Sequence, residues 1–158
     1  MPIYIKFQMI KGDAMESGFE YWIAANSFQF GANRQVGSGA GGKTRESSAP
    51  SIADIVITKE WDSASPKLYQ DAVAGTFDNK VQIKMTTTTK DRTETFLTYD
   101  LSDCGVSSYS ISSGGDRPME SLSLNFIKIM VTPTPLDKSG RIKRGDIVSY
   151  DLLAMKAS

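Results

Sequence analysis

The sequence predicts a mainly β fold, an antiparallel two-sheet barrel or sandwich with one short helix at its flank. Short runs rich in β-branched and aromatic residues recur along the chain, separated by Gly, Asp, Asn and Pro. Several of these runs alternate apolar with polar side chains, as a strand with one buried face does. Only one segment has helical periodicity, which argues against an alternating α/β fold.

About nine segments are expected to form strands. The first begins where Ile3, Ile5 and Phe7 alternate with polar or amphipathic residues. The expected strands are 3–9, 19–24, 27–30, 52–61, 81–89, 93–101, 106–112, 120–131 and 147–153.

The strand expected at 120–131 divides its residues between an apolar and a polar face. Leu122, Leu124 and Phe126 form the apolar face, and the alternation slips at Ile127. The polar face consists of Ser121, Ser123 and Asn125. Nothing in the surrounding sequence would activate these groups as nucleophiles or bases. The segment is therefore expected to be part of a wall rather than a catalytic site.

One short helix is expected at about 66–74. Ser65 suits its N-cap and Pro66 its first helical position, while Gly75 suits a left-handed ending. The side chains expected to face the sheets are Leu68, Tyr69, Ala72 and Val73. So short a helix is not stable alone and must lie against the strands.

A glycine- and serine-rich stretch without periodicity is expected to form a long extended loop at about 32–51. Loops of this length are uncommon in compact domains and usually have a function. Within it, Gly37–Thr44 matches the phosphate-loop pattern letter for letter. That chemistry needs a helix directly after the loop. Here Arg45–Pro50 has no apolar helical period, so we interpret the match as chance.

The composition argues against several function classes. Lys plus Arg and Asp plus Glu both number 18, so the net charge is zero, whereas nucleic-acid-binding proteins carry a basic excess. A neutral total suits a protein that packs against copies of itself. The chain has no histidine and a single cysteine, Cys104, expected to be a small apolar residue near a strand end. A histidine-based triad or metal site and a disulfide within the chain are excluded, so we expect no enzyme, cofactor or metal.

The sequence also carries no targeting or membrane signal. The first residues lack the basic and apolar regions of a signal peptide, and no apolar run reaches the ~18 residues of a membrane span. We expect a cytoplasmic protein without membrane insertion, exported only by a route that accepts the folded chain.

Three blocks follow one another along the chain: Asn26–Gly31, Thr58–Leu68 and Gly115–Phe126. Together and in this order they resemble the Hcp (haemolysin-coregulated protein) family of type VI secretion systems, and the resemblance extends over most of the chain. It implies a single tube domain over 1–158 that forms a hexameric ring. Such rings stack head to tail into an inner tube, which a contractile sheath and a spike protein deliver into a neighbouring cell. The tube protein is itself secreted and carries effectors in its lumen.

The resemblance and the residue pattern together suggest two sets of site residues. Phe28 and Phe30 are expected to pack inward, which leaves Ser27 and Gln29 facing the lumen and its effectors. The glycine-rich loop is expected to contact the next ring, through Arg34, Gly39, Gly42, Lys43 and Arg45.

Two other functions fit the same sequence features. A phage-type tail tube protein obeys the same physical constraints. A monomeric barrel that binds a small ligand would need an apolar pocket with converging polar groups.

Overall fold

The computed structural model describes residues 2–34, 36–38, 45–47, 50–90, 92–134, 148–152 and 156–157. It contains one helix and a series of antiparallel strands in these residues. In chain order the elements are β1 Ile3–Phe7, β2 Ile23–Ala25, β3 Ser27–Gln29, β4 Ala32–Asn33, β5 Val36–Ser38, β6 Arg45–Ser47, β7 Ser51–Ile52, β8 Ile55–Glu60, α1 Ser65–Ala74, β9 Asn79–Thr89, β10 Arg92–Ser112, β11 Met119–Asn125, β12 Lys128–Pro133, β13 Val148–Asp151 and β14 Lys156–Ala157.

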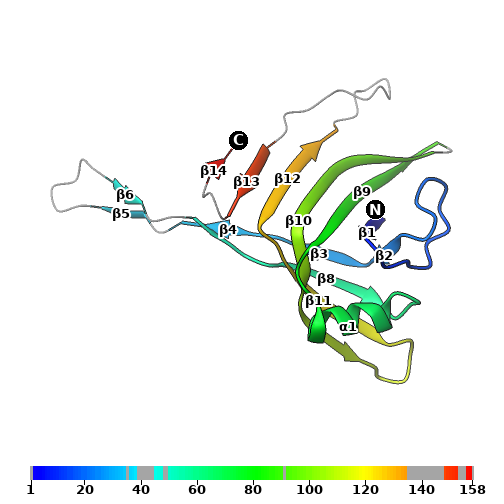
Figure 1. Cartoon of the computed structure of the whole chain (residues 1–158). Helices are drawn as coiled ribbons and strands as arrows, with labels where there is room; N and C mark the ends of the chain where they lie inside the picture. The colour runs from blue at the N-terminus through cyan, green and yellow to red at the C-terminus, as the bar shows by residue number, and fades with distance from the viewer. Residues whose placement is uncertain are drawn as a thin grey trace.

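The long strand β10 joins two layers (Figure 1). Up to Ser102 it pairs with β9 and β12, in a first sheet ordered β2-β1-β9-β10-β12-β13-β14. From Gly105 it pairs with β11, in a second sheet ordered β10-β11-β8-β3. The mainly β, two-sheet antiparallel sandwich with a flanking helix is thus confirmed. Among the described residues the sheet does not close into a barrel.

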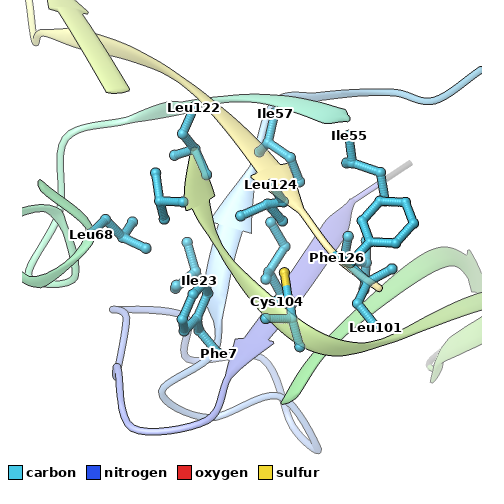
Figure 2. Close-up of a cluster of buried hydrophobic side chains, with 14 of the residues drawn as sticks. Phe7, Ile23, Ile55, Ile57, Leu68, Leu101, Cys104, Leu122, Leu124 and Phe126 are labelled. Carbon is cyan, nitrogen blue, oxygen red and sulfur yellow. The ribbon is translucent and has the colours of Figure 1, made fainter. Parts of the chain in front are cut away.

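The core lies between the two layers, where the inward side chains of both sheets meet. Figure 2 shows these side chains converging from β1, β2, β8, β10, β11 and α1. The fully enclosed residues include Ile23, Ile55, Ile57, Leu101, Cys104 and Leu124. Each large aliphatic side chain buried in this way stabilises the fold by roughly 1.5–3 kcal/mol relative to an exposed one.

Several strand boundaries differ from the expected ones. The strand expected at 19–24 begins only at Ile23, in β2, and the one expected at 52–61 is interrupted between β7 and β8. The strands expected at 93–101 and 106–112 are one continuous strand, β10, with register irregularities on both sides of Cys104. The strand expected at 120–131 is two strands that separate at Phe126 and Ile127, where the alternation slips. At that break the Ile127 amide donates a hydrogen bond to the Ser102 carbonyl.

The helix lies where the sequence predicts it, but both expected end signals are wrong. Pro66 is in the first turn as expected, whereas the N-cap is Ala64 and makes no side-chain capping bond. Gly75 ends the helix in an extended conformation, with φ −71°. Of the expected buried face, Leu68 is buried, while Tyr69 and Val73 are 56% and 67% exposed.

The described parts of the stretch at 32–51 form two short antiparallel ladders. β4 pairs with β7, and β5 pairs with β6 further along. Figure 1 shows the β5–β6 ladder projecting well away from the sandwich, with β4 nearer to it, and we call the two ladders together the arm. Short ladders explain how a glycine-rich segment without apolar periodicity extends away from the body: its backbone groups pair across the ladders.

Candidate functional site: a hydroxyl face on the second sheet

The outward side of the second sheet carries two rows of uncharged side chains in cross-strand register, all of them polar except Val56. One row consists of Ser27, Thr58, Ser121 and Ser110, from β3, β8, β11 and β10. The next consists of Gln29, Val56, Ser123 and Ser108, from the same strands. We call these eight residues the hydroxyl face.

The orientation of β3 follows from its two aromatic neighbours, which pack inward. Phe28 and Phe30 both lie against Tyr99, with ring centroids 4.8 and 5.9 Å away. Because alternate residues of a strand point to opposite sides, Ser27 and Gln29 point outward and are exposed. The inward packing expected for the two phenylalanines is confirmed.

The hydroxyl face is uncharged between two acidic ends. None of its residues is ionisable, and the Ser27 and Thr58 hydroxyl groups hydrogen-bond to each other. At one end the Asp54 carboxylate accepts hydrogen bonds from Ser107 and Asn125, at 2.7 and 2.9 Å. At the other end, Glu60 of β8 lies 3.5 Å from an Arg117 side-chain nitrogen. Such a surface offers many hydrogen bonds and little fixed charge to whatever contacts it.

On the inward side of the same strands lies a buried ionic network. The Lys59 ammonium group is 2.6 Å from Glu120 and 3.0 Å from Asp62, and it donates a hydrogen bond to the Ser65 hydroxyl. The hydroxyl groups of Ser65 and Tyr109 donate to Glu120. Burial and the bond to Glu120 raise the pKa of Tyr109, so its phenol stays protonated.

This network holds the helix to the sheet and is closed to any substrate. The side chains of Lys59 and Glu120 are 1% and 0% exposed, and Ser65 is also buried. The Ser65 oxygen accepts from the Asp62 amide, which binds the turn before α1. A hydroxyl used in this way is not free to cap the helix, which explains the error about Ser65.

Sequence reasoning missed this network, although a signal was present. Lys59 continues the inward series begun by Ile55 and Ile57 on β8. Glu120 likewise precedes Leu122 on the inward side of β11. Opposite charges at two positions where alternation demands apolar residues indicate a buried ion pair.

Only some of the residues expected to contact the next ring lie in the part of the chain that the structure describes. Arg34 is exposed just after β4, and Arg45 begins β6. Gly39, Gly42 and Lys43 lie outside the described residues.

The phosphate-loop match at 37–44 also runs beyond the described residues. It begins in β5, and β6 starts directly after it. The residues that follow the match therefore form a strand that pairs with β5. A phosphate loop requires a helix at that position, so the interpretation as a chance match gains support.

Cys104 is fully enclosed in the core, and it lies within β10 rather than near a strand end as expected. Burial raises the pKa of its thiol to about 12, which keeps it protonated and poorly nucleophilic. The described part of the chain contains no group of three or more His, Cys, Asp or Glu side chains placed to hold a metal ion. Nor does any helix found in it have the length and apolar character needed to span a bilayer.

The fold and these surfaces define a class of scaffold protein, an open β-sandwich that presents broad faces and a projecting arm. A family model described as the type VI secretion system effector Hcp matches residues 4–132. The chain belongs to this Hcp family, whose members are structural tube proteins of type VI secretion systems.

Solved structures agree with this assignment. A type six secretion system protein is 25% identical, with a TM-score of 0.91 over 99% of both chains. Hcp1 from Salmonella typhimurium is 20% identical, with a TM-score of 0.77 over 99% of this chain and 98% of its own. A type VI secretion system effector from Yersinia pestis is 18% identical, with a TM-score of 0.69 over 94% of this chain and 98% of its own. No curated protein sequence matches.

Proposed function

We propose that this protein is the ring-forming protomer of a type VI secretion inner tube, with 1–158 as one tube domain. Six copies form a ring with the hydroxyl face toward the lumen, and the rings stack head to tail. The tube carries effectors, contacts a spike protein and a contractile sheath, and is secreted from the cytoplasm in its folded form. Nucleic acid and membrane insertion have no part in it. Family membership supports this role, and the hydroxyl face is the observation that carries it.

The open edges of the second sheet favour closure of a ring. Among the described residues, β3 pairs only with β8, and β10 beyond Gly105 pairs only with β11. Unpaired strand edges favour pairing with another chain. Contact between the β3 edge of one copy and the β10 edge of the next is heterologous, and a rotation that closes makes a ring. In such a ring the hydroxyl faces adjoin and line one surface.

A hydroxyl-lined lumen suits the transport of folded cargo. Serine, threonine and glutamine side chains exchange hydrogen bonds with water and cargo at little net free-energy change. Without fixed charges, the wall does not select cargo by its net charge. Ser27 and Gln29 are the residues we assign to effector contact.

The arm is the part we assign to contact between rings. It projects from the sandwich, so it is placed to reach beyond its own subunit (Figure 1). Arg34, Lys43 and Arg45 would supply cations for acidic groups on the next ring, while Gly39 and Gly42 would supply backbone freedom. Exposed charge pairs weaken with salt, whereas buried apolar contacts do not.

The first test is the native mass of the purified protein, with negative-stain images of the same sample. A six-fold ring with an open centre is the expected result. A stable monomer at micromolar concentrations would overturn the proposal and favour a ligand-binding protein.

The lumen assignment is tested by Gln29→Arg, with Gln82→Arg on the first sheet as the matched control. We expect both variants to form rings and only Gln29→Arg to lose co-purifying effector. Unchanged effector recovery with Gln29→Arg would remove this residue from the cargo site.

The stacking assignment is tested by deleting 37–42. Rings should persist while tubes become shorter, and added salt should shorten wild-type tubes as well. Tubes of undiminished length would contradict a role of the arm in stacking.

A further inference from the structure

The outward side of the first sheet differs from the hydroxyl face because it carries charged side chains. Lys6, Gln82, Asp100 and Met130 form a cross-strand row over β1, β9, β10 and β12. Lys80 and Lys84 lie on β9 two residues before and after Gln82, so their side chains point to the same side of the sheet. We call this row, together with Lys80 and Lys84, the lysine face.

A hollow of about 590 Å³ lies on the lysine face, and two ammonium-bearing side chains line it. Its lining includes Lys6, Lys80, Gln8, Gln82, Asp100 and Ser102. Asp100 is the single acid in that lining, and its carboxylate accepts a hydrogen bond from the Gln82 amide at 2.9 Å. Neither lysine forms a salt bridge with a carboxylate of the described residues. The hollow therefore presents cations for which the described part of the chain supplies no salt-bridge partner.

Trp22 fixes part of this surface. The ammonium groups of Lys6 and Lys84 lie 6.0 and 5.5 Å from the centre of its ring. Trp22 in turn packs edge-on against Phe19, whose ring is stacked on Tyr4 of β1. These contacts place both ammonium groups beside one aromatic ring and restrict their motion, which lowers the entropy lost when an anion binds them.

We propose that the lysine face is a docking surface for an acidic segment of a partner protein, whose carboxylates enter the hollow beside Lys6 and Lys80. Charge complementarity identifies the partner's chemistry: the surface offers spaced ammonium groups, with glutamine and serine side chains between them. This inference rests on the proposed function in one respect. If the hydroxyl face lines the lumen, the opposite layer of the sandwich lies on the outside of the ring, where a partner can reach it.

The test uses Trp22 as a local reporter. The chain has two tryptophans, so Trp61→Phe leaves Trp22 as the sole indole emitter. In this background an oligoglutamate peptide should change the Trp22 fluorescence with a saturable dependence, while an oligoglutamine peptide should not. Lys6→Gln and Lys80→Gln should each weaken binding of the oligoglutamate peptide by about two- to fivefold, as expected for one exposed ion pair.

Lys67→Gln is the matched control, because Lys67 is an exposed lysine on α1. It should leave peptide affinity unchanged. Equal losses for Lys67→Gln and Lys80→Gln would mean that the peptide senses only total charge, and would overturn the proposal. So would the absence of any Trp22 response at millimolar peptide, or an equal response to inorganic phosphate at the same ionic strength.

Native mass on the same samples separates this proposal from the proposed function. Rings that fail to bind oligoglutamate contradict the docking role of the lysine face and leave the proposed ring intact. A monomer that binds the peptide with the expected lysine dependence supports the docking surface and contradicts the ring.

Discussion

The hydroxyl face and the lysine face are the two outward sides of one sandwich, and they are built by the same alternation. β10 contributes to both, with Asp100 facing outward in the first sheet and Ser108 and Ser110 facing outward in the second. Only the polar residues chosen differ: short neutral groups on one side, long charged groups on the other. A net charge of zero for the whole chain therefore hides a neutral face and a charged one. Charge distribution is more informative about partners than the total.

The largest expected effect comes from breaking the interior that both faces share. Lys59→Met leaves the Glu120 carboxylate buried without its cation, and we expect this to cost about 3–5 kcal/mol of unfolding free energy. The double variant Lys59→Met with Glu120→Gln should recover part of that loss. Urea unfolding measures both, and Lys67→Met on the exposed side of α1 is the control. If Lys59→Met lowers the free energy of unfolding no more than Lys67→Met does, the buried network is not needed for stability.

Local patterns were enough to predict which side chains face outward on two of the strands, β3 and β11. Alternation predicted that Ser27 and Gln29 point outward, and that Ser121 and Ser123 share a face. It did not predict that these residues lie in common rows, because register depends on pairing between strands distant in the sequence. The row that joins Ser27 to Ser110 is therefore a property of the tertiary fold.

The helix shows a second limit of local reasoning. Ser65 has the right identity and position for an N-cap, yet its hydroxyl group bonds to Lys59 and Glu120. A tertiary partner that is buried and charged competes successfully with the helix end. Tyr69 is exposed for a related reason, since the ionic network and Leu68 occupy the helix–sheet contact.

The buried thiol predicts a pH effect of intermediate size. Cys104 has a pKa of about 12 in the folded chain and an ordinary value of 9.0. Because the folded pKa is the higher one, its contribution to stability is complete below pH 9 and is lost as pH rises toward 12. Within that window the loss is about 1.4 kcal/mol per pH unit. Urea unfolding of wild type and Cys104→Ala should show it as a difference in how steeply the free energy of unfolding falls with pH, since every other ionisable group is common to both proteins. If the free energy of unfolding falls equally steeply with pH in both proteins, the thiol ionises alike in the folded and unfolded states.

On the lysine face, the bond between Gln82 and Asp100 should contribute more than an ordinary exposed hydrogen bond. Gln82→Ala removes a donor to a charged acceptor, and we expect a loss of about 1 kcal/mol in urea unfolding. In an Asp100→Asn background the same substitution should cost about 0.5 kcal/mol, because the acceptor is then neutral. The same cost in both backgrounds would contradict a role for the carboxylate charge.

On the hydroxyl face, the corresponding substitution should have the smallest effect of all. Ser27→Ala removes the bond between the Ser27 and Thr58 hydroxyl groups, both neutral and open to water, and we expect a loss of about 0.5 kcal/mol. Ser27→Thr keeps a hydroxyl group and serves as the control in the same urea experiment. A loss as large as that of Gln82→Ala would mean that the hydroxyl rows stabilise the sheet itself. A small loss means that the hydroxyl groups are almost as well bonded to water as to each other. Those groups can then exchange hydrogen-bond partners at little free-energy cost, which is the property that the proposed lumen requires.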